Sequence, residues 1–91
     1  MIEKCKDWIT KSGERADEYY RAMTRWATSE RRNGKIKDLI KLGSAYKWAL
    51  EQALECLQGL RRTERVAKEI SDTKEYKSLV TAELNTLREL E

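Results

Sequence analysis

The 91 residues of this chain suffice for one small domain. Charged side chains make up 38% of the sequence and Pro and Phe are absent, a composition typical of long helices. The net charge of +3 does not require an anionic partner, and no window approaches the roughly 20 apolar residues of a membrane span. We therefore expect a single all-α domain over residues 1–91 with no membrane partner. The opening residues lack the apolar region of a secretory signal, so we expect a cytoplasmic location.

The first predicted helix covers residues 2–32. Apolar residues recur there at alternating steps of three and four, which is the spacing of a coiled-coil seam. The seam consists of Ile2, Cys5, Ile9, Ser12, Ala16, Tyr19, Met23 and Trp26. Asn33 and Gly34 follow, and both residue types tolerate the left-handed conformation in which helices commonly end. We therefore predict a turn at 33–34.

The second predicted helix covers residues 35–69, because the same steps resume after the turn. This seam consists of Ile36, Leu39, Gly43, Tyr46, Leu50, Ala53, Leu57, Leu60, Glu64 and Ala67. If the chain reverses at 33–34, Met23 faces Gly43, a large residue against a small one. The two arms then form a long antiparallel helical hairpin resembling a coiled coil. The pattern leaves open whether the second helix breaks at Gly59.

The third predicted helix covers residues 73–90. Asp72 and Glu75 have the spacing of a capping box. The stripe of this helix is formed by Tyr76, Val80, Leu84, Leu87 and Leu90, with Leu79 beside it. A helix of about 18 residues spans roughly 27 Å, whereas each hairpin arm spans near 45–50 Å. We therefore expect a shorter third helix on the end of the hairpin away from the turn.

Cys5 and Cys56 are the two cysteines. In the predicted hairpin they lie roughly 7 Å out of register along the axis, whereas the Cα atoms of a disulfide usually lie within about 6.8 Å in total. We therefore expect two reduced, small apolar residues and no intrachain bridge. An intersubunit disulfide or a redox role remains the alternative.

The sequence carries few residues suited to catalysis. Histidine, the commonest general base and metal ligand, is absent, and the four glycines are scattered rather than gathered in a phosphate loop. We expect no enzymatic activity, no metal, no cofactor and no small-molecule substrate. A helical enzyme subunit completed by another polypeptide is the weakest alternative.

The apolar arc of the second helix is wider than one hairpin partner covers, which favours a further protein contact. We predict a protein interface formed by Tyr20, Met23, Ile40, Tyr46 and Trp48. Its occupant is a second copy of the chain, a larger protein, or both. The expected function is that of an adaptor or inhibitor. Trp48 has a competing interpretation, in which it folds along the stem of Lys41 or packs on the third helix.

Basic residues gather around the predicted turn and support the alternative function, nucleic-acid binding, because such patches neutralise phosphates. The candidate contacts are Arg25, Arg31, Arg32, Lys35 and Lys37. The competing interpretation is that these side chains keep the turn in water and complement the end of the first helix.

Overall fold

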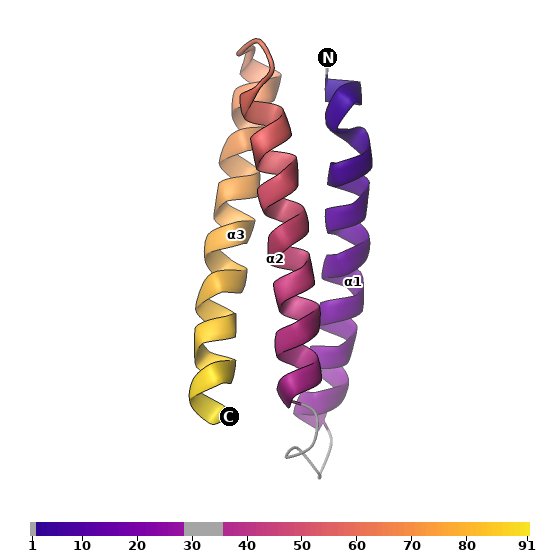
Figure 1. The fold of residues 1–91 in the computed structure, drawn as a ribbon, viewed down its shortest axis with the longest axis vertical. Coiled ribbons are helices and arrows are strands. Elements are labelled where there is room, and N and C mark those ends of the chain that lie inside the picture. Colours follow the sequence, from indigo (N-terminus) through magenta and orange to yellow (C-terminus); the bar gives the residue numbers. More distant parts are fainter. Residues whose placement is uncertain (1, 29–35) are drawn as a thin grey trace.

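The computed structural model describes residues 2–28 and 36–91, and all regular structure in these ranges is helical. A short 3-10 helix, η1 (Ile2–Cys5), leads into α1 (Lys6–Thr28), and α2 (Ile36–Gln58) and α3 (Glu64–Leu90) follow. The chain runs along α1, back along α2 and again along α3 (Figure 1). The all-α prediction is confirmed for these residues, whereas the turn predicted at 33–34 lies outside them.

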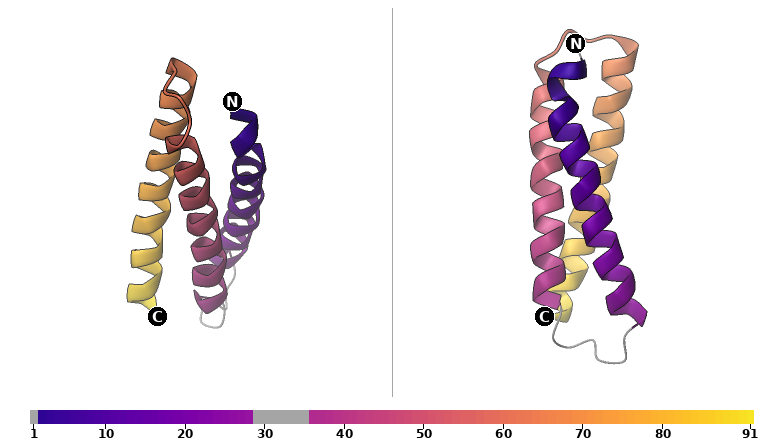
Figure 2. Two further views of the ribbon diagram at one scale, coloured as in Figure 1. Left: turned by 45° about the horizontal axis from the view of Figure 1, so that its top comes forward. Right: turned by 90° about the vertical axis from the view of Figure 1, so that its right-hand side faces the viewer.

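Helix α2 is the central element, because α1 and α3 both pack along it. Turned views show α1 lying obliquely across the α2–α3 pair (Figure 2). The predicted seams face inward: their buried members are Cys5, Ser12, Tyr19, Leu39, Gly43, Tyr46, Leu50, Ala53 and Leu57. The predicted burial is therefore confirmed as far as Leu57. Beyond it the pattern fails, since Glu64 and Ala67 are exposed.

The prediction of a second helix over 35–69 is wrong because α2 ends at Gln58. The backbone N–H groups of Gly59 and Leu60 each donate to a carbonyl oxygen three residues earlier, at 3.1 Å. Such short-range bonds satisfy the last carbonyl groups of a helix and end it. The helix break at Gly59, which the sequence pattern left open, is therefore present.

The start predicted for the third helix is wrong as well, because α3 begins nine residues before position 73, at Glu64. Thr63 is its N-cap, and the hydroxyl oxygen accepts the backbone N–H of Val66 at 3.2 Å. This bond satisfies one of the free donors at a helix start. Asp72, the expected cap, lies inside α3.

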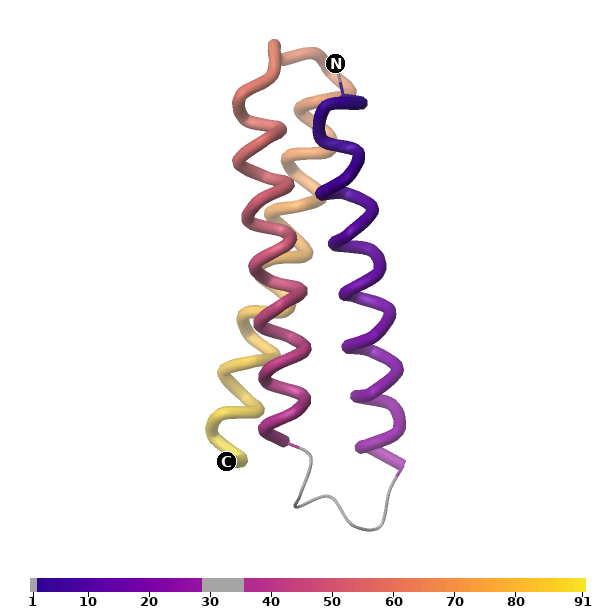
Figure 3. Tube along the Cα trace, turned by 45° about the vertical axis from the view of Figure 1, so that its right-hand side comes forward, coloured from indigo at the N-terminus to yellow at the C-terminus, as the bar shows by residue number. Residues whose placement is uncertain are grey.

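Within the described residues α3 is the longest element, with 27 residues against 23 in each of α1 and α2, so the expectation of a third helix of about 18 residues is wrong. Its inner seam buries Val66, Ile70, Thr73, Val80, Leu84 and Leu87. Leu84 and Leu87 share the larger core cluster with Leu39, near the start of α2. Helix α3 thus accompanies α2 along its length (Figure 3) and is not confined, as we expected, to one end of it.

Gly43 of α2 lies close to side chains of both other helices. A Cβ atom at this position would lie 2.7 Å from Cδ2 of Leu84 and 2.8 Å from Cε1 of Tyr19. The α1 residue nearest Gly43 is therefore Tyr19, whereas we predicted Met23. The register is therefore shifted by one helical turn from the one that we counted from a turn at 33–34.

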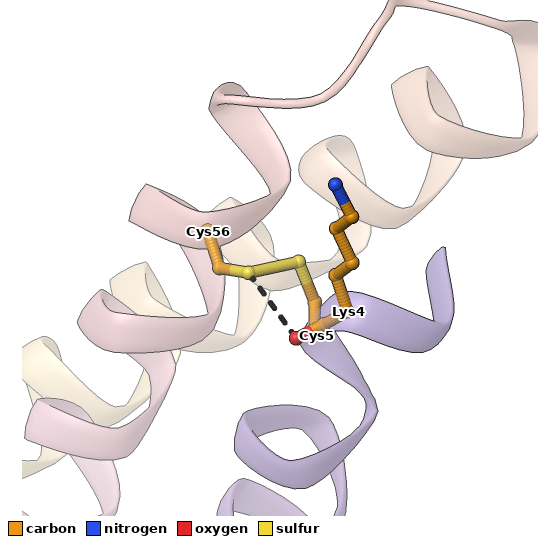
Figure 4. Close-up of a disulfide and its surroundings, with 3 residues drawn as sticks. All are labelled: Lys4, Cys5 and Cys56. Atoms are coloured by element: carbon orange, nitrogen blue, oxygen red, sulfur yellow. Dashed lines mark hydrogen bonds between the residues drawn. A yellow bond between two sulfur atoms is a disulfide. The ribbon is translucent and has the colours of Figure 1, made fainter. Parts of the chain in front are cut away.

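A disulfide joins Cys5 to Cys56, with the two Cα atoms 5.8 Å apart (Figure 4). The expectation of two unbridged cysteines is therefore wrong, and the cause is the same shift in register. Cys5 is fully buried in the second core cluster, with Leu57, Val66 and Ile70. The bridge thus ties η1 to the last turn of α2, beside the start of α3.

Candidate protein-docking surface

The five predicted interface residues do not form one surface. Tyr46 is only 5% exposed, and Met23 and Ile40 are partly buried against the larger core cluster. Tyr20 and Trp48 are exposed, at 38% and 52%. Tyr20 contacts α3, whereas Trp48 lies beside α1, as the next paragraphs show. Two separate surfaces therefore remain as candidates.

Tyr20 belongs to a cluster in which tyrosines of α1 and α2 gather around Glu83 of α3. The hydroxyls of Tyr19 and Tyr20 both donate to Oε1 of Glu83, at 3.2 and 3.1 Å. The ring of Tyr46 lies 6.2 Å from that of Tyr19 and 6.0 Å from that of Tyr20, between centroids. A single carboxylate therefore holds α3 against α1.

The cluster keeps its tyrosines protonated. Burial, followed by the charge of Glu83 and the hydrogen bond to it, raises the pKa of Tyr19 and of Tyr20 well above the usual value. Burial also raises the pKa of Tyr46, with smaller contributions from Tyr76 and Glu83. The neutral phenols can therefore keep donating to the carboxylate throughout the physiological pH range.

Trp48 of α2 packs edge-on against Trp8 of α1, with ring centroids 5.2 Å apart and the planes at 82°. Such T-shaped pairs contribute about 0.5–1.5 kcal/mol beyond their burial. Nζ of Lys11 lies 5.4 Å from the ring centroid of Trp8. This aromatic pair braces α1 against α2, a contact that neither competing interpretation of Trp48, along Lys41 or on the third helix, included.

The largest exposed apolar side chains outside these contacts lie on α3. Tyr76, Leu79 and Leu90 are 49%, 53% and 56% exposed. They belong to a second series of alternating steps of three and four, which we call the outer stripe: Asp72, Tyr76, Leu79, Glu83, Thr86 and Leu90. Because α3 carries this stripe as well as its buried inner seam, its apolar residues cover two adjacent faces.

Sequence reasoning missed the outer stripe because it merged the two series. It assigned Tyr76 and Leu90 to one stripe together with Val80, Leu84 and Leu87. The signal that separates them is the N-cap together with Ile70, since alternating steps that run from Val66 through Ile70 reach Val80 and Leu87 and pass over Tyr76 and Leu90.

Charge is divided between the two flanks of α3. Lys74 and Lys77 line a shallow surface hollow together with Leu54 of α2. The outer stripe contains Asp72 and Glu83, and the helical period places Glu75 beside them. The flank towards α2 is therefore basic, and the flank that carries the outer stripe is acidic from Asp72 onward.

The predicted nucleic-acid contacts are described only in part. Arg25 and Lys37 are exposed, whereas Arg31, Arg32 and Lys35 lie outside the described residues. Arg25 shares a small surface hollow with Asp38, which lowers the positive potential there. Nucleic-acid binding therefore stays a prediction.

Within residues 2–28 and 36–91, no group of three or more Cys, Asp or Glu side chains is placed to hold a metal ion. In the same ranges no helix has the length and apolar character needed to cross a membrane. Comparisons of the chain with protein-family models, with curated proteins and with solved structures found no match.

Proposed function

We propose that this protein works by binding another protein through the outer stripe of α3, as an adaptor or an inhibitor and without enzymatic activity. The observation that supports the proposal is the exposure of Tyr76, Leu79 and Leu90 along one line of a helix whose adjacent inner seam is buried. An apolar line at this spacing is the surface that one amphipathic helix offers to another.

The energy available at this stripe suits a specific contact. Fully burying a Leu or an aromatic side chain is worth about 1.5–3 kcal/mol, and half of that remains for a side chain that is half exposed. The three exposed residues together therefore offer roughly 3 kcal/mol or more, about a hundredfold in affinity.

The rest of the fold serves the stripe as a platform. In this proposal α1 and α2 form the predicted antiparallel hairpin, with the bridge between Cys5 and Cys56 at one end. Tyr19 and Tyr20 hold α3 on that hairpin through Glu83. A helix fixed in this way loses little conformational entropy when a partner binds.

Affinity capture from the source cell tests the proposal. We expect the wild type and Trp48→Ala to retain the same partner, whereas Leu79→Asp loses it. Trp48 is the matched control, because it lies on a different surface and its exposed fraction of 52% is close to the 53% of Leu79. Equal capture by wild type and Leu79→Asp, or a loss caused only by Trp48→Ala, contradicts the proposal.

The redox state of the cysteines indicates the compartment in which the protein resides. Disulfides persist in oxidising compartments and are rare in the cytosol. The cytoplasmic location, which we predicted from the opening residues, therefore stays a prediction. The test is to alkylate the protein as it is taken from the source cell. Two free thiols support the cytoplasmic location, and the absence of free thiols contradicts it.

A further inference from the structure

The charge pattern around the outer stripe specifies the chemistry of its partner. From Asp72 to the end of the chain, the charged residues on this flank of α3 are acidic. They are Asp72, Glu75, Glu83 and Glu89. The basic residues of the same segment, Lys74, Lys77 and Arg88, lie on the flank towards α2. The apolar line is therefore bordered by negative charge over about five helical turns.

Glu83 gives this border a defined centre. Its Oε1 accepts two neutral phenol hydroxyls, and no residue in the described part of the chain forms an ion pair with it. Because both donors are neutral, no opposite charge among the described residues lies in a hydrogen bond or ion pair with this carboxylate. Its second oxygen, Oε2, receives no hydrogen bond from the described residues and is left for a cationic donor.

Exposed phenol rings stand along the same line. Tyr20 of α1 contacts Glu83 directly, and Tyr76 lies two turns before Glu83 on the outer stripe. Aromatic faces attract ammonium and guanidinium groups by cation–π interaction. A Lys or Arg that approaches Glu83 therefore meets a carboxylate beside the exposed ring of Tyr20.

A second copy of the chain does not match this surface in a parallel arrangement. If two outer stripes paired in parallel and in register, the carboxylates of Asp72, Glu75 and Glu83 would lie opposite the same carboxylates of the other copy. Like charges placed across an interface oppose association. A parallel homodimer is therefore disfavoured at this surface. An antiparallel one would bring Arg65 and Lys68, which precede Asp72 on the same line of α3, towards carboxylates of the other copy, and the sedimentation measurement below decides it.

We propose that the occupant of the outer stripe is an amphipathic helix of a partner protein, with apolar residues at heptad spacing and Lys or Arg beside them, one of which pairs with Glu83. This proposal rests on the function proposed above and names the partner's chemistry. The matching length is about 18 residues, because the stripe extends from Asp72 to Leu90.

Three synthetic 18-residue helical peptides test it. The first carries Leu at heptad positions flanked by Lys, the second replaces every Lys by Glu, and the third keeps Lys but replaces every Leu by Ser. We expect the first peptide to bind at least about tenfold more tightly than either of the others in fluorescence anisotropy. Since the protein itself has a net charge of +3, general attraction does not favour the Lys peptides.

Two variants connect the binding to the stripe. Glu83→Gln keeps an oxygen that accepts the tyrosine hydroxyls but removes the charge, and we expect about five- to tenfold weaker binding of the first peptide. Leu79→Asp removes the apolar contact at an exposed position, and Trp48→Ala is the control that binds like the wild type. Circular dichroism and urea unfolding show whether each variant is folded.

The outcomes separate the two proposals. Equal affinity for the Lys and Glu peptides, or no effect of Glu83→Gln on a folded protein, overturns the basic helix. A dimer in sedimentation that Leu79→Asp dissociates also overturns it, in favour of a second copy. If the peptides fail while Leu79→Asp still abolishes capture of the natural partner, the proposed function survives and only the basic helix is refuted.

Discussion

Gly43 and Gly13 give opposite responses to the same substitution. Replacing Gly by Ala inside a helix gains about 1 kcal/mol of helix propensity at either position. A methyl group at Gly13 meets no atom within 4 Å, so Gly13→Ala should stabilise the protein by about 1 kcal/mol. The same methyl group at Gly43 lies 2.8 Å from Tyr19 and 2.7 Å from Leu84.

The overlap at Gly43 decides the sign there. Ordinary carbon contacts are about 3.5–4.0 Å, so Tyr19 and Leu84 must each move by about 0.7 Å or more. Neither moves easily, because both are almost fully buried and the hydroxyl of Tyr19 is bound to Glu83. Overpacking costs about 1–3 kcal/mol, and the upper half of this range applies here. Gly43→Ala should therefore destabilise the protein by a net amount of about 1–2 kcal/mol.

Urea unfolding followed by circular dichroism measures both variants. The gap between Gly13→Ala and Gly43→Ala should be about 2–3 kcal/mol, which is the overpacking cost alone, since the gain in propensity cancels. The packing of Tyr19 and Leu84 on Gly43 is refuted if Gly43→Ala is as stable as Gly13→Ala.

Three further changes test other parts of the structure. Reducing the bridge, or replacing Cys56 by Ser, frees a loop with a sequence separation of 51 residues. It should lower the free energy of unfolding by about 4 kcal/mol, and unchanged urea midpoints with and without reductant would contradict the bridge. The raised pKa of Tyr19 means that the folded state holds its proton more tightly than the unfolded state. The contribution of Tyr19 to the free energy of unfolding should therefore be fully present below pH about 10 and decrease above it by up to about 1.4 kcal/mol per pH unit. The free energy of unfolding should decrease less steeply with pH in Tyr19→Phe, and equal slopes for the variant and the wild type in alkaline unfolding would argue against this. If the protein binds nucleic acid, Arg25→Glu should weaken the binding of duplex DNA and reduce its dependence on salt concentration, whereas Arg88→Glu should change neither. Identical DNA titrations of the two variants would remove nucleic-acid binding as the alternative function.

The inward faces of α1 and α2 were predictable because apolar spacing is a local property of the chain. Tyr19, Leu39, Tyr46 and Leu50 were placed on the seams and are buried. The same spacing extended the second helix too far, because Leu60 happens to fall on the next step after Leu57. The stop at Gly59 and the cap at Thr63 were both present in the sequence and outweigh that one apolar residue.

The contacts between helices were not predictable in the same way, because they depend on register. A shift of one turn replaces Met23 by Tyr19 opposite Gly43 and brings Cys5 to Cys56. The outer stripe depends on the start of α3, since the face that a residue occupies is defined only once the inner seam is known. The candidate surface therefore required the structure, although Tyr20 and Trp48 were expected to be exposed from the sequence.

The bridge between Cys5 and Cys56 makes a covalent ring that contains α1 and α2 and leaves α3 outside. A protease that cuts after Arg61 or Arg62 therefore sets α3 free as a separate peptide, held only by its contacts, while a cut between α1 and α2 leaves those two helices chemically joined. Among α1, α2 and α3, the helix that carries the outer stripe is thus the one that a single nick can detach.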